Sequence, residues 1–99
     1  MEEKKVLLSM LRTLRDDVEN IQQKGAGYYS TGPFVERYNK LLGRLRKLFS
    51  GETDMLEIFS DIEDTKSVDP ADKSKTAQKI AMELNQLITF IDSAMREAN

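Results

Sequence analysis

The sequence predicts an all-α protein, a small antiparallel helical bundle of three longer helices and one short helix. Apolar side chains recur at steps of three and four in four separate segments, and no segment shows the alternation typical of a half-buried strand. Only two prolines and five glycines interrupt the 99 residues. We expect one helical-bundle domain over residues 1–99, because a chain of this length can bury one core and not two.

The first helix is expected at about residues 2–24. Its apolar residues fall at alternating steps of four and three: Leu7, Leu11, Leu14, Val18 and Ile21. This spacing places them in one line along a helix. Gly25 follows as a C-cap, because glycine readily adopts the left-handed backbone that ends many helices.

The second helix is expected at about residues 33–49. Pro33 suits a first helical position, with Thr31 or Gly32 as the cap before it. The apolar positions form two adjacent lines: Phe34, Tyr38, Leu41, Leu45 and Leu48, and beside them Val35, Leu42 and Phe49. A face this wide is more typical of a packed bundle than of a two-stranded coiled coil.

A short helix is expected at about residues 54–64, capped either by Thr53 or by a capping box of Asp54 and Glu57. Its apolar residues are Met55, Leu56, Ile58, Phe59 and Ile62. The pattern leaves open whether this helix folds back on the second helix or extends it.

The last helix is expected at about residues 70–97. Asp69 as N-cap and Pro70 at the first position give it the clearest start signal in the chain. Its main apolar line is formed by Ala77, Ile80, Leu84, Leu87, Ile91 and Ala94.

The charges are unevenly distributed, with five basic and one acidic residue in 33–50 but eight acidic and one basic in 51–72. The basic stripe consists of Arg37, Lys40, Arg44 and Lys47, at steps of three, four and three. Alone it resembles an anion or phosphate surface. However, Asp54, Glu57, Asp61 and Asp64 repeat the same steps. In an antiparallel hairpin the two stripes would pair, so we interpret the basic stripe as part of the fold and disfavour it as an anion contact.

No catalytic, metal or cofactor site is expected. The chain has no histidine, cysteine or tryptophan, which excludes zinc sites built from Cys and His and nucleophiles activated by His. The acidic stretch from Asp61 to Asp72 lacks the glycine and the glutamate of a calcium-binding loop. The glycines between Gly25 and Gly32 lack the lysine of a phosphate-binding loop. We therefore expect that the protein is not an enzyme.

Three residues are candidate partner contacts. Tyr28 and Tyr29 lie in a glycine-flanked loop, where an aromatic ring could anchor a partner, although burial of one ring at the end of the bundle is the competing interpretation. Met82 falls opposite the apolar line of the last helix, and an exposed methionine can form an adaptable contact.

We expect a non-catalytic helical protein–protein interaction module, such as an adaptor, an assembly domain or a terminal domain of a larger system. Its protein partner is not identified by the sequence, and a homodimer stays open. The alternative is a small inhibitor or immunity-type protein that blocks a toxin or enzyme, since the chain resembles the bacteriocin immunity bundles in size and predicted helix count. A third hypothesis is a nucleic-acid-binding regulator that uses the basic stripe, but the net charge of −2 argues against it.

The sequence also favours a cytoplasmic protein that does not contact a membrane. No apolar run approaches the roughly 18 residues that a membrane-spanning helix needs. The first residues, from Met1 to Lys5, lead into a helical pattern and not into the apolar stretch of a signal peptide.

Overall fold

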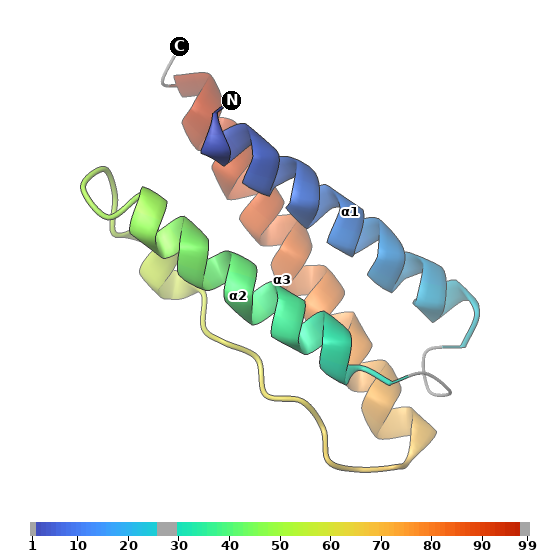
Figure 1. Ribbon diagram of the computed structural model, residues 1–99. Helices are drawn as coiled ribbons and strands as arrows, with labels where there is room; N and C mark the ends of the chain where they lie inside the picture. The colour runs from blue at the N-terminus through green and yellow to red at the C-terminus, as the bar shows by residue number, and fades with distance from the viewer. Residues whose placement is uncertain (1, 26–29, 98–99) are drawn as a thin grey trace.

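The computed structural model describes residues 2–25 and 30–97. They form three α-helices, α1 (Glu3–Gln23), α2 (Gly32–Leu48) and α3 (Pro70–Glu97), and one short 3₁₀ helix, η2 (Met55–Ile58) (Figure 1). No strand occurs in these described ranges. The predicted all-α class is confirmed, and the bounds of the three long helices differ from the predicted ones by at most one residue.

Two of the expected boundary signals are present at the helix ends. Gly25 follows α1 with a φ of 96°, the left-handed conformation expected of a glycine at this position. Asp69 accepts a hydrogen bond from the Ala71 N–H at 2.9 Å, directly before α3 begins at Pro70. Thr31 precedes α2 as its N-cap residue, but its hydroxyl donates to the carboxylate of Asp64 and does not cap the helix.

The helix α1 runs antiparallel to both α2 and α3, whereas α2 and α3 run in the same direction (Figure 1). Lys4, near the start of α1, reaches Glu52, just beyond the end of α2, at 2.6 Å. Arg12, in the first half of α1, lies 3.5 Å from Asp92, near the end of α3. The antiparallel arrangement expected from the sequence therefore holds for α1 and not for the pair α2 and α3.

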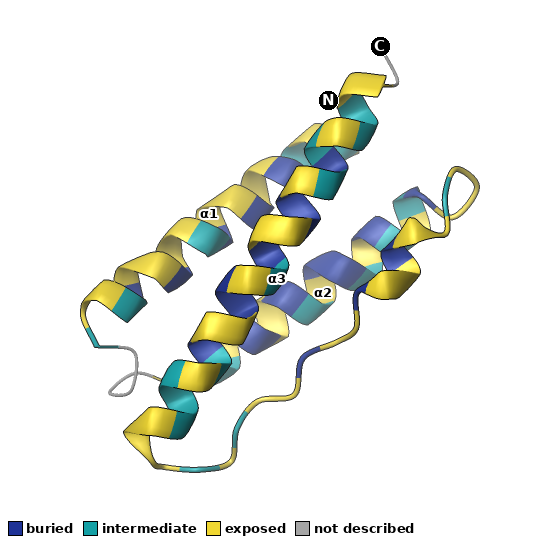
Figure 2. Ribbon diagram, turned by 180° about the vertical axis from the view of Figure 1, so that it is seen from behind, coloured by how far each residue is buried: buried dark blue, intermediate teal, exposed yellow. Residues whose placement is uncertain are grey.

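The prediction of a helix throughout residues 54–64 is wrong, because only Met55–Ile58 are helical. The helical turn η2 ends at Ile58, and Phe59 has extended backbone with φ −96° and ψ 131°. We call residues 59–69 the return segment, because they run back along α2 toward its first residue (Figure 2). The physical reason is the distance that the connection must cover, because the parallel order of α2 and α3 requires it to run along α2, which is about 25 Å long. Eleven extended residues span up to about 36 Å and cover this distance with length to spare, whereas a helix over 59–64 followed by five extended residues would only just cover it, at about 26 Å.

The return segment and η2 take part in the core. Leu56, Phe59 and Ile62 are buried together with the apolar faces of the three helices. The Asn39 side chain makes two hydrogen bonds to the backbone of Ile62. Its N–H donates to the Ile62 carbonyl and its oxygen accepts from the Ile62 N–H, each at 2.9 Å. Arg46 donates to the Phe59 carbonyl. The extended backbone thus takes from α2 some of the hydrogen bonds that a helix would supply internally.

Candidate interaction surface

The prediction that the basic stripe pairs with the acidic residues after it is wrong. Arg44 hydrogen-bonds Glu3 of α1, and Lys40 pairs with Glu36 of its own helix at 2.9 Å. These bonds hold the pKa values of both glutamates below the ordinary value of 4.5. Among the described residues, no ion pair joins the stripe to the four acids proposed as its partners: Asp54, Glu57, Asp61 and Asp64.

The extended return segment explains this outcome. Without a helix over 54–64, the carboxylates do not repeat at helical spacing and do not face the basic stripe. Asp61 lies 3.7 Å from Arg46, which is outside the stripe, and Asp64 accepts the Thr31 hydroxyl. The return segment therefore follows a different side of α2 from the one that the charge pattern indicated.

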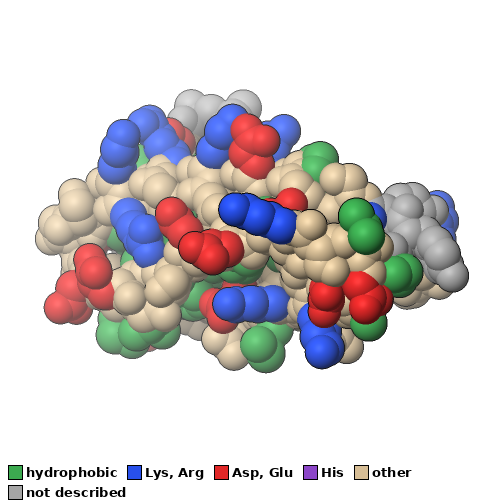
Figure 3. Space-filling view, turned by 90° about the horizontal axis from the view of Figure 1, so that it is seen from below, with side chains coloured by type: hydrophobic (Ala, Val, Ile, Leu, Met, Phe, Trp, Pro, Cys, Tyr) green, Lys and Arg blue, Asp and Glu red, His purple; other side chains and the backbone are tan. Residues whose placement is uncertain are grey.

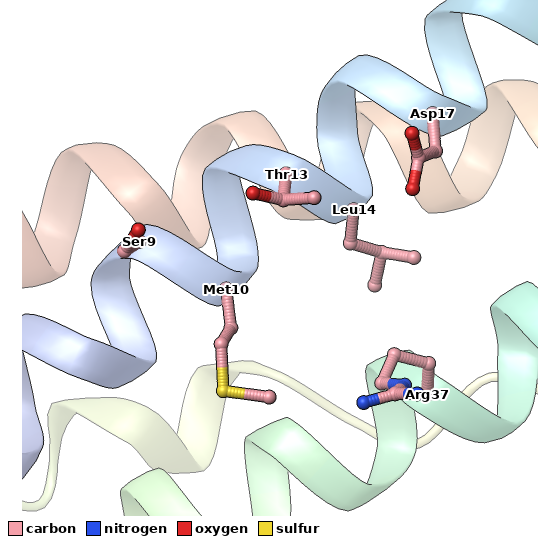
Figure 4. Close-up of a pocket in the computed structure, with 6 residues that line it drawn as sticks. All are labelled: Ser9, Met10, Thr13, Leu14, Asp17 and Arg37. Atoms are coloured by element: carbon pink, nitrogen blue, oxygen red, sulfur yellow. The ribbon is translucent and has the colours of Figure 1, made fainter.

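Arg37 lines a hollow between α1 and α2 with a volume of about 270 Å³ (Figure 4). Met10 and Leu14 extend from α1 toward α2, and Arg37 lies across from them (Figure 4). Asp17 of α1 also lines this hollow, so its lining holds one anion and one cation. Because the lining holds one charge of each sign, the hollow has no net charge that would select one kind of ligand.

On the face drawn in Figure 3, the charges do not form the basic patch of a nucleic-acid interface. Figure 3 shows one face of the molecule on which acidic and basic side chains are interspersed and hydrophobic side chains are exposed in separate patches. A protein that binds nucleic acid presents basic side chains gathered on one face. Lys47, the last residue of the basic stripe, is exposed, whereas Lys40 and Arg44 have the acidic partners described above.

Tyr38 is the titratable side chain that the core encloses, with no exposed surface. Burial raises the pKa of the Tyr38 phenol well above its usual value of 10, and the Glu83 carboxylate raises it further. The phenol therefore stays protonated at neutral pH. Because it is enclosed, it does not offer a solvent-accessible acid or base.

Of the predicted partner contacts, Tyr28 and Tyr29 lie outside the described residues. Met82 is 54% exposed on the outer face of α3. Gln86 follows it by one helical turn, so the two side chains lie on the same side of α3.

Gln86 belongs to a larger apolar feature that the sequence did not reveal. Two hollows follow the second half of α3 and share Phe90; we call them together the α3 groove. One hollow, of about 380 Å³, is lined by Ile58, Phe59, Asn85, Gln86, Thr89 and Phe90. The other, of about 340 Å³, is lined by Phe49, Glu52, Thr53, Met55, Phe90, Ala94 and Glu97.

The short helix η2 supplies the exposed wall of the α3 groove. In a 3₁₀ helix, side chains three residues apart lie one above the other. Met55 and Ile58 of η2 form such a pair and are exposed, to 49% and 68%. Leu56 of η2 and Phe59, the extended residue that follows η2, are buried in the core. This short segment thus anchors two apolar side chains in the core and presents two others to solvent.

The sequence pattern does not single out this groove, because its spacing places Met55 and Ile58 on the apolar face of a helix. Phe90 lies directly before the buried Ile91 and is half-buried at the edge of the core. The available signal was its position two helical turns beyond Met82, on the outer flank of the apolar line.

Other kinds of site are not indicated in the part of the chain that the structure describes. Within residues 2–25 and 30–97, no three acidic side chains lie close enough together to hold a metal ion. None of the described helices has the length and apolar character needed to cross a membrane. Comparisons of the chain with known protein families, with curated proteins and with solved structures found no match.

Proposed function

We propose that this protein is an interaction module that binds a protein partner through the α3 groove. The observation that carries the proposal is the exposure of Met55 and Ile58 next to Phe90. A small protein that has already buried a continuous core gains nothing for its own folding from large apolar side chains in solvent. Contiguous exposed apolar surface with a polar border is characteristic of protein-binding sites.

The groove offers both parts of a typical interface. Ile58 and Phe90 form an apolar floor into which a partner side chain could insert, and such anchors supply most of the affinity of an interface. Asn85, Gln86 and Thr89 border this floor with hydrogen-bonding groups. These side chains would orient the partner, while the apolar contact would hold it.

Of the other functions considered from the sequence, the inhibitor fits the groove equally well and the nucleic-acid-binding role receives less support. An inhibitor that blocks a toxin or enzyme would use the same groove, and the identity of the partner would distinguish it from an adaptor. A nucleic-acid-binding role would depend on the basic stripe, but Arg44 and Lys40 already pair with Glu3 and Glu36.

The test compares Ile58→Ser with Val68→Ser, which removes a similar apolar side chain that is 87% exposed and does not line the groove. Partners would be captured from an extract of the source organism with the wild-type protein, then purified and titrated against all three proteins. We expect Ile58→Ser to weaken direct binding by about tenfold or more, as for an interface anchor, and Val68→Ser to leave it within about twofold.

Equal affinities of the wild-type and Ile58→Ser proteins for the purified partner would contradict the proposal. An equal loss in both variants would also contradict it, because the effect would then not be specific to the groove. Thermal unfolding of the three proteins should give similar midpoints, since both replaced side chains are exposed.

A further inference from the structure

We infer that the α3 groove accepts a cationic amphipathic segment of its partner, one whose apolar side chains are flanked by lysine or arginine; this inference rests on the proposed function. The charged residues that line the groove, Glu52 and Glu97, are both acidic. Asp54 and Glu57 are exposed in or beside η2 and bracket Met55 in the sequence. Two carboxylates therefore line the hollow at Met55, and two more belong to or adjoin the short helix that forms the groove wall.

No lysine or arginine lines either hollow of the groove. The sequence has no lysine or arginine from Leu48 to Thr65, nor between Lys79 and Arg96 of α3. Lys4 of α1 neutralises Glu52 in part, through a contact of 2.6 Å. Asp54 and Glu57 have no ion-pair partner among the described residues. The groove thus carries an unbalanced negative charge although the whole chain has a net charge of only −2.

This charge distribution selects between kinds of partner. An anionic or acidic segment would bring like charges together beside a surface that excludes water, which is unfavourable. A cationic segment would be attracted over several ångströms and would place its charges opposite Asp54 and Glu57. The apolar floor would supply affinity and the carboxylates would supply specificity and orientation.

In a second copy of the chain, α2 is the helix with the largest excess of basic residues, and it does not provide a suitable segment. In its basic stripe, Lys40 and Arg44 already have acidic partners. The exposed residues of α2 after Pro33 are all charged: Glu36, Arg37, Lys40, Arg44 and Lys47. That face offers no apolar side chain to fill the hollow at Ile58 and Phe90.

The test uses a synthetic amphipathic peptide built from leucine and lysine, labelled with fluorescein, and a matched peptide with glutamate in place of every lysine. Fluorescence anisotropy measures the binding of each peptide to the full chain. We expect the lysine peptide to bind at least about tenfold more tightly than the glutamate peptide at about 50 mM salt, and to lose much of that advantage at about 500 mM salt, where screening shortens the range of the attraction.

Variants of the protein show which acidic residues attract the lysine peptide. The double change Asp54→Asn and Glu57→Gln should weaken binding of the lysine peptide by about fivefold or more and flatten its salt dependence, because exposed charges act mainly through screened attraction. Asp17→Asn is the matched control, since Asp17 is an exposed acid in the hollow between α1 and α2. This control should bind the peptide within about twofold of the wild type.

Equal binding of the two peptides, or an unchanged affinity in the double variant, would overturn the inference. A dimer in light scattering that Ile58→Ser dissociates would also overturn it, because the occupant would then be a second copy. In these cases the proposed function would stand if Ile58→Ser still abolished binding of the natural partner. If Ile58→Ser changed neither peptide binding nor partner binding, the proposed function and the inference would fail together.

Discussion

Single side chains determine where the return segment lies. Asn39 offers both a donor and an acceptor, and it uses both on the backbone of Ile62. No hydrophobic pattern indicates such a role, because an asparagine on a helix is ordinarily a solvated residue. The core residues were easier to predict: Leu11, Leu45 and Leu84 lie on the periodic lines of their helices and are fully buried.

Asn39→Ala should lower the free energy of unfolding by about 1–3 kcal/mol, because the N–H and carbonyl of the buried Ile62 both lose their partner. Urea unfolding measures the change. The control is Asn20→Ala, at an exposed position of α1, which should alter stability by less than about 0.5 kcal/mol. Equal effects of the two changes would show that the contact with Ile62 does not hold the return segment.

The three long helices were predictable at the scale of elements because their periodicity is sustained and their ends carry local signals. Gly25 and Asp69 act through their own backbone or side chain, so sequence alone is informative there. Residues 54–64 are different. Their apolar spacing fits a helix, but a segment this short is decided by what it must cover and connect. Leu56, Phe59 and Ile62 reach the core from a helical turn followed by extended chain.

Ser60→Pro distinguishes an extended return segment from a helix over residues 54–64. Phe59, with φ −96° and ψ 131°, already has the backbone that a residue before proline prefers. We therefore expect a loss of stability below about 1 kcal/mol, whereas proline inside a helix costs about 3 kcal/mol. Gln78→Pro, at an exposed position in α3, is the control for the helical case. Similar losses in both variants, measured by thermal or urea unfolding, would contradict the extended return segment.

The arrangement of the whole molecule depends on contacts that no single segment encodes. The charge stripes suggested that the chain turns back after α2 as a helical hairpin, and the pairing of Arg44 with Glu3 shows that α1 supplies the partner instead. The parallel order of α2 and α3 is possible because the extended return segment is long enough to run back along α2. The same order places η2 beside the second half of α3, which creates the α3 groove.

In the whole molecule, the acidic residues of 51–72 have a different role from the one that the sequence indicates. Four of its carboxylates were expected to neutralise the basic stripe within the molecule. In the structure, Asp54 and Glu57 remain exposed without an ion-pair partner among the described residues, close to Met55 and Ile58. The charge separation that the sequence shows is therefore available for an intermolecular contact at the groove.

Titration of the isotope-labelled protein with the leucine and lysine peptide, followed by amide NMR shifts, tests this surface most directly. We expect the shifts to concentrate in residues 52–59 and 85–97, the ranges that contain most of the residues lining the two hollows. A bound segment changes the environment of the groove, while the rest of a preformed bundle moves little. Shifts concentrated instead in residues 37–47 of α2, or spread evenly over the chain, would contradict the α3 groove as the binding surface.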